Sequence, residues 1–132
     1  MNYMLDTNIC IYIAKRQPAS VLEKFEALSG EEIALSSISY SELMYGVYKS
    51  QQREKNRDVL TRLAESLTVL PYDQSAADHY GDIRFQLETQ GSPIASMDLL
   101  IAAHARSLGL TLVTNDFKDF ERVENLKLEN WV

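Results

Sequence analysis

Short apolar segments alternate with helical patterns along this chain, and this alternation constrains the fold more than any other feature. Candidate strands occupy residues 2–5, 33–36, 68–70, 110–114 and 126–128. Between them, apolar residues recur at helical spacing. Parallel strands need long, usually helical connections, which cover both faces of the sheet. We therefore expect an α/β fold, a three-layer sandwich with a central, mostly parallel sheet of four to five strands flanked by helices.

The composition is that of an ordinary globular protein: of 132 residues, 45% are hydrophobic and 24% charged. No repeat or linker divides the chain, so we expect one domain over residues 1–132. The single cysteine, Cys10, cannot form an internal disulfide and lacks partners for a zinc site, which fits a reducing compartment. With no basic N-terminal region and no spanning apolar stretch, we expect a cytoplasmic protein without membrane attachment.

The net charge is −6, which argues against direct binding of duplex DNA by this chain alone through broad phosphate neutralisation. The basic residues are uneven, because Lys49 to Arg62 carries a local charge of +3. That segment either contacts phosphate or forms a solvated helix face of mixed charge. In the preceding helix, Tyr40, Met44 and Tyr48 share a face that could stack on bases, pack in the core or meet a partner.

The helix expected over residues 97–108 carries one acid, Asp98, in an otherwise apolar first turn that Ser96 could cap. One interpretation is a favourable interaction with the helix dipole, worth about 0.3–1 kcal/mol. The other is a functional site, which requires further acids nearby.

His104 lies about 120° from Asp98 around the helix, and His79 belongs to another helix, so we expect neither to be catalytic.

Three further acids follow candidate strands. Asp6 and Asp116 come directly after a strand, and Glu42 follows residues 33–36 by a short loop. Ligands of parallel sheets bind beyond the carboxyl ends of the strands. We therefore expect Asp6, Glu42, Asp98 and Asp116 to meet at one edge. Glu42 has an alternative role, because Ser39 and Glu42 match the S-x-x-E capping box at a helix start.

Such a cluster would need a counter-charge. Four carboxylates about 5 Å apart repel by a total on the order of 20 kcal/mol at an effective dielectric near 20, which exceeds the stability of about 5–15 kcal/mol typical of a domain. Protons or a divalent cation must compensate. Oxygen-only ligands favour Mg²⁺ or Mn²⁺, and phosphodiester hydrolysis by an activated water is the matching chemistry. We expect Asp6, Asp98 and Asp116 as ligands, with Glu42 binding metal or orienting the water.

Short polar residues flank these acids and could hold their rotamers by hydrogen bonds. They are Thr7, Asn8, Thr114 and Asn115. The alternative is that they are ordinary turn residues.

Four segments resemble the motifs of PIN-domain ribonucleases, and of VapC toxins in particular: MLDTNICIY at 4–12, SYSELMYG at 39–46, GSPIASMDLLIAAHA at 91–105, and LVTNDFKDF at 112–120. The resemblance spans residues 1–132 and implies a PIN-like nuclease domain. It places Asp6, Glu42, Asp98 and Asp116 at the family's acidic positions, Thr114 at its hydroxyl position, and Asp119 as an outer acid.

The resemblance also implies an activity and partners. The activity is that of a Mg²⁺- or Mn²⁺-dependent endoribonuclease, which arrests translation by cutting structured RNA, often tRNA. The implied partners are a VapB-type antitoxin that inhibits the enzyme and a second copy of the chain in a homodimer. An antitoxin arginine could replace the metal in the acidic pocket. Two alternatives stay open: a haloacid-dehalogenase-like phosphohydrolase that uses Asp6, although Asn8 stands where that motif wants Asp, and a non-catalytic, receiver-like binding module.

Overall fold

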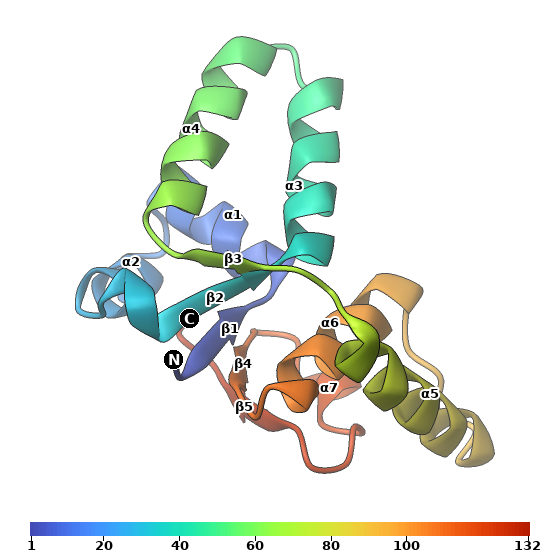
Figure 1. Ribbon diagram of the computed structural model, residues 1–132. Helices are drawn as coiled ribbons and strands as arrows, with labels where there is room; N and C mark the ends of the chain where they lie inside the picture. Colours follow the sequence, from blue (N-terminus) through green and yellow to red (C-terminus); the bar gives the residue numbers. More distant parts are fainter.

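The protein is built on a five-stranded sheet in the order β3-β2-β1-β4-β5, in which every neighbouring pair is parallel (Figure 1). This computed structural model describes residues 1–132. The strands are β1 Tyr3–Leu5, β2 Ile33–Ser36, β3 Thr68–Leu70, β4 Thr111–Val113 and β5 Lys127–Glu129. The expected α/β class is confirmed, and the sheet is wholly rather than mostly parallel.

Helices connect the strands and cover both faces of the sheet. They are α1 Thr7–Lys15, α2 Ala19–Glu26, α3 Ser37–Lys49, α4 Arg53–Glu65, α5 Gln74–Thr89, α6 Ser96–Ser107 and α7 Phe117–Phe120, with a 3₁₀ turn η1 at Gly30–Glu32. Figure 1 shows α3 and α4 side by side as a hairpin that projects away from the sheet, whereas α5 lies against α6. None of these helices combines the length and apolar character needed to cross a membrane.

Alternation along the central strands separates two hydrophobic cores. Met4 and Leu112 pack in the cluster that contains residues of α5 and α6. Their neighbours Leu5 and Val113 pack with residues of α1 and α2. All four side chains have no exposed surface, and full burial of such a side chain contributes about 1.5–3 kcal/mol. The three-layer arrangement therefore follows from strands that are apolar on both faces.

The start of α3 differs from the prediction. Ser36 at the end of β2 is the N-cap, and its Oγ accepts a hydrogen bond of 3.1 Å from the Ile38 amide. The alternative prediction of a capping box between Ser39 and Glu42 is therefore wrong, because strand β2 runs into α3 without a loop and the helix begins at Ser37. Ser39 is buried inside the helix, and the Glu42 carboxylate is left available for other contacts.

The start of α6 also differs. Ser96 is the first helical residue rather than the cap, and Ala95 at the N-cap position makes no side-chain capping bond. Deeper in this helix, the buried His104 places Nδ1 2.8 Å from Ser36 Oγ. His79 accepts a hydrogen bond of 2.8 Å from Arg106 Nε. Both histidines are thus engaged in contacts between elements of the fold.

Candidate functional site

Three carboxylates meet beyond the carboxyl end of β4. One oxygen from each of Asp98, Asp116 and Asp119 lies within 4.8 Å of the others. Asp98 comes from the first turn of α6, Asp116 is the N-cap of α7, and Asp119 lies within α7. The short helix brings Asp119 back toward Asp116 because residues three apart share a helix face.

Asp6 is the most enclosed acid of the site, with 5% of its surface exposed. As N-cap of α1, its Oδ1 accepts a hydrogen bond of 3.1 Å from the Ile9 amide. Its Oδ2 accepts one of 2.5 Å from Thr114 Oγ1, and that same hydroxyl accepts one of 2.9 Å from the Asp116 amide. Burial raises the pKa of Asp6 above its ordinary value, although these hydrogen bonds act in the opposite direction.

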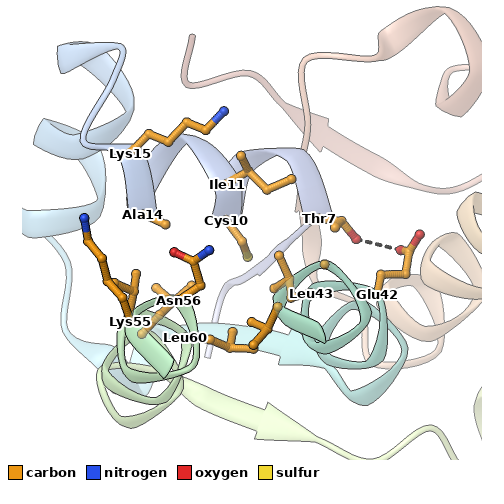
Figure 2. A pocket seen from close by; sticks show the side chains of 14 residues that line it. Thr7, Cys10, Ile11, Ala14, Lys15, Glu42, Leu43, Lys55, Asn56 and Leu60 are labelled. Atoms are coloured by element: carbon orange, nitrogen blue, oxygen red, sulfur yellow. Dashed lines mark hydrogen bonds between the residues drawn. The ribbon is translucent and has the colours of Figure 1, made fainter. Parts of the chain in front are cut away.

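Glu42 is held from the neighbouring helix. Thr7 Oγ1 donates a hydrogen bond of 2.7 Å to Glu42 Oε1 across the gap between α1 and α3, as Figure 2 shows. Because Thr7 directly follows Asp6, this bond couples the position of Glu42 to the end of β1. The Glu42 carboxylate of α3 therefore points toward the strand end that carries Asp6.

The acids share one electrostatic environment. The pKa of Asp98 is raised to about 6, first by burial and then by the charges of Asp116, Asp6, Glu42 and Asp119. Each contribution from a like charge requires proximity. Asp119 thus lies in one group with Asp98 and Asp116, and Asp6 and Glu42 lie near enough for their charges to act on Asp98.

The two expected asparagine supports do not contact the acids. The Asn115 amide donates a hydrogen bond of 3.0 Å to the Tyr12 hydroxyl, and the Asn8 side chain is exposed with no hydrogen bond to a carboxylate. Asn115 lies in the bend between β4 and α7, so the turn-residue interpretation holds for it, whereas Asn8 belongs to the first turn of α1. Thr7 and Thr114 do make the expected hydrogen bonds.

Comparison with known proteins identifies the family. The PIN domain family matches residues 3–126 of the chain. The tRNA(fMet)-specific endonuclease VapC of Shigella flexneri is 47% identical over 131 residues, which cover 99% of this chain and 98% of the relative. Ribonuclease VapC2 of Haemophilus influenzae is 46% identical over 132 residues, covering 100% and 99% respectively. The chain belongs to the VapC family of PIN-domain proteins.

A solved structure agrees with this assignment. The crystal structure of VapBC2 from Rickettsia felis bound to a DNA fragment from their promoter contains a chain with a TM-score of 0.92 to this one. The two are 42% identical, and the match covers 100% of each. Membership of the VapC family favours the nuclease hypothesis over the phosphohydrolase and receiver-like alternatives.

The donor set of this VapC-family site is chemically uniform. Every candidate ligand at the cluster is a carboxylate oxygen, with no histidine or cysteine among them. Hard divalent cations such as Mg²⁺ and Mn²⁺ prefer such ligands. The spacing of Asp98, Asp116 and Asp119 and the raised pKa of Asp98 both fit a pocket that gains stability when a cation shares it.

An apolar groove adjoins the acidic cluster. It has a volume of about 490 Å³ and lies between α1, α3 and α4. Its walls include Ile11, Leu43 and Leu60, with the Thr7–Glu42 pair at one end and Lys15 and Lys55 toward the other (Figure 2). The groove therefore offers an apolar surface that begins at one of the site acids.

Proposed function

We propose that this protein is a toxin of the VapC type, an endoribonuclease that hydrolyses phosphodiester bonds in tRNA or other structured RNA and so arrests translation. The observation that carries this proposal is the convergence of Asp98, Asp116 and Asp119 within 4.8 Å, beside Asp6 and Glu42. The Shigella flexneri relative is specific for tRNA(fMet), which supports tRNA as the substrate class.

Mg²⁺ or Mn²⁺ is the proposed cofactor, held by Asp6, Asp98 and Asp116, with Asp119 beside them and Glu42 binding the ion or orienting the attacking water. When bound, such an ion lowers the pKa of water and neutralises charge on the phosphate. The cluster of acids alone would repel a phosphodiester, because all five side chains carry negative charge when ionised. The carboxylates therefore serve RNA chemistry only together with a cation.

The hydroxyl groups of the site position these acids. Thr114 holds the Asp6 carboxylate and the Asp116 backbone through a single hydroxyl. Thr7 holds Glu42. Each bond removes rotational freedom from a carboxylate before substrate arrives, which favours the productive geometry. Asp6 has both oxygens occupied by donors from the protein and is buried, which suits a fixed ligand better than a nucleophile.

A VapB-type antitoxin is the proposed protein partner, supported by the similarity to the chain in the Rickettsia felis VapBC2 structure. The apolar groove between α1, α3 and α4 would accept an apolar segment of that partner. A segment seated there would reach Glu42 at the end of the groove and could cover the acidic cluster. We also propose a homodimer, which size-exclusion chromatography with light scattering would test.

The deciding experiment incubates the purified protein with total tRNA in Mg²⁺, Mn²⁺ or EDTA. We expect discrete cuts that require the metal, and loss of cutting in Asp6→Asn and Asp98→Asn. Asp78→Asn is the matched control, since Asp78 is an exposed acid of α5 that makes no hydrogen bond through its side chain. Cutting that persists in EDTA, or at the parental rate in Asp98→Asn, would contradict the metal-dependent mechanism.

A further inference from the structure

The end of the α3–α4 hairpin gathers basic and aromatic side chains. We call this surface the hairpin tip and define it by Tyr45, Tyr48, Lys49, Arg53 and Arg57. Figure 1 shows that the connection between α3 and α4 is the part of the hairpin farthest from the sheet. Tyr45 and Tyr48 are large aromatic residues left 66% and 47% exposed. Such rings on a solvated helix face need an explanation.

The cations of the hairpin tip rest on these rings. Lys49 Nζ lies 5.1 Å from the centre of the Tyr45 ring. The guanidinium carbons of Arg53 and Arg57 each lie 5.0 Å from the centre of the Tyr48 ring. Arg53 also donates two hydrogen bonds, of 3.1 and 2.7 Å, to the Tyr48 carbonyl. These contacts hold the positive groups in place without neutralising them.

None of the three cations is paired with a carboxylate. The salt bridges of the protein join Arg62 to Asp58, Arg84 to Glu88 and Arg106 to Asp82. The protein as a whole carries a net charge of −6. Three fixed and unpaired cations nevertheless lie together on one surface, separate from the acidic cluster. Their mutual repulsion falls when an anion binds, so the surface fits an anionic partner.

The hairpin tip is aligned with the acidic site. Glu42, Tyr45 and Lys49 occupy positions i, i+3 and i+7 of α3 and therefore share one face of that helix. The rise from Glu42 to Lys49 is about 10 Å along the helix axis. A chain that passes over the acidic cluster and continues along this face would meet the Tyr45 ring first and the cations next.

RNA is the anionic partner that this combination favours. A phosphate backbone supplies repeated negative charge, and its bases supply faces that stack on an exposed aromatic ring. An acidic protein segment would also bind the cations. It has less need of the exposed Tyr45 ring, which lies on the same face of α3 as Glu42. We propose that the hairpin tip binds the part of the RNA substrate that flanks the cleaved bond, with Tyr45 as a stacking surface and Lys49, Arg53 and Arg57 as phosphate contacts.

This inference rests on the proposed function, and its test separates the two. The triple variant K49A/R53A/R57A is compared with K24A/R62A/K127A, which removes the same charge at exposed positions outside the hairpin tip. Binding of initiator tRNA is measured by fluorescence anisotropy at several salt concentrations, in proteins that also carry Asp6→Asn to prevent cutting. Cleavage kinetics are measured in the same triple variants with Asp6 restored.

We expect the hairpin-tip variant to bind the tRNA about tenfold more weakly or worse, and to lower the slope of log K against log salt by about two to three, as loss of three phosphate contacts predicts. The loss of cleavage should lie in KM rather than kcat, because the reacting groups are untouched. The control variant should keep most of its affinity and salt slope. Tyr45→Leu should weaken binding several-fold, whereas Tyr45→Phe keeps the ring and should retain it.

Two results would overturn the inference in distinguishable ways. If the parent protein cuts tRNA but the hairpin-tip variant matches it in affinity, salt slope and KM, the surface does not bind RNA and is assigned to solvent or to a protein partner. If the parent protein neither binds nor cuts tRNA, the proposed function fails and the inference fails with it.

Discussion

The hydroxyl of Thr114 donates a hydrogen bond of 2.5 Å to the carboxylate of Asp6, joining the ends of β4 and β1 across 108 positions of sequence. Because β1 and β4 are neighbours in the sheet, this bond fixes the most buried acid of the site to the strand that leads to Asp116. It is the clearest link between the fold and the proposed chemistry.

Replacing Thr114 by valine should impair both stability and cleavage. The buried Asp6 would lose its side-chain donor, and an unsatisfied buried group costs about 1–3 kcal/mol of unfolding free energy. We expect RNA cleavage to fall by about 10–100-fold, as for other residues that orient metal ligands. Urea denaturation and single-turnover cleavage measure the two effects. Thr114→Ser keeps the hydroxyl and should restore most of both; a serine variant as defective as valine would contradict this role.

Replacing Thr7 by valine should affect cleavage more than stability. The bond from Thr7 to Glu42 is only partly buried, so its loss should cost about 0.5–1.5 kcal/mol. Glu42 would then sample several rotamers, and cleavage should fall by about tenfold or more. If Thr7→Val and Glu42→Gln are combined, the double variant should lose little more than Glu42→Gln alone. Additive losses would show that Thr7 does not act through Glu42.

The pH dependence of stability should report the acidic cluster. In the folded, metal-free protein the pKa of Asp98 is about 6, above the 3.8 of an unperturbed aspartate. Between these values the folded state holds a proton that the unfolded chain releases, so this group stabilises the fold as pH falls from about 6 toward 4 and destabilises it above that window. Asp98→Asn should therefore raise Tm above pH 6, and the gain should shrink toward pH 4.

Metal should act in the same pH range. Added Mg²⁺ should raise the Tm of the parent above pH 6, where Asp98 is ionised, and lose this effect as Asp98 becomes protonated. Thermal denaturation of parent and Asp98→Asn with Mg²⁺ or EDTA measures both behaviours. His104 has a pKa lowered by burial, which works in the opposite direction in both proteins, so the difference between the two Tm curves isolates Asp98. A constant difference across pH 4–8 would contradict the assignment.

Two glycine substitutions should have opposite signs. A Cβ at Gly30 would lie 2.5 Å from the Ser66 carbonyl oxygen, which belongs to the backbone and cannot rotate away. Gly30→Ala should therefore destabilise the protein by about 1–3 kcal/mol. Gly81 lies inside α5 with no atom within 4 Å of its Cβ position, so Gly81→Ala should stabilise it by about 0.5–1 kcal/mol. Urea denaturation of both variants checks this pair, and equal signs would contradict it.

Local patterns in the sequence were enough to place Asp6 and Asp116 after strands and Asp98 in the first turn of a helix. The parallel order of the strands then directed those residues to one edge, because the central strands β1, β2 and β4 are largely buried on both faces and must be covered by helices. The capping box at Ser39 failed for a local reason. Ser36 lies closer to the point where the backbone leaves β2, and its hydroxyl reaches the Ile38 amide first.

The approach of Asp119 to Asp98 could not be read in the same way. Their distance depends on how α7 packs beside α6, which is set by contacts between residues far apart in sequence. The same holds for Asn115, whose side-chain amide donates a hydrogen bond to the Tyr12 hydroxyl of α1. It also holds for Arg53 and Arg57, whose guanidinium groups lie over the Tyr48 ring. Spacing had suggested basic residues near phosphate without indicating which of them are unpaired.

The amino-acid pattern alone was sufficient for the order of the elements, the parallel sheet and the positions of Asp6, Asp98 and Asp116 at the ends of strands and helices, because hydrophobic periodicity and strand-end positions are local properties. Packing in three dimensions established which hydroxyl holds which carboxylate, which acids come within reach of one ion, and which cations stay free. Those features depend on distances between side chains from different elements, and such distances arise only when the two cores close on the sheet.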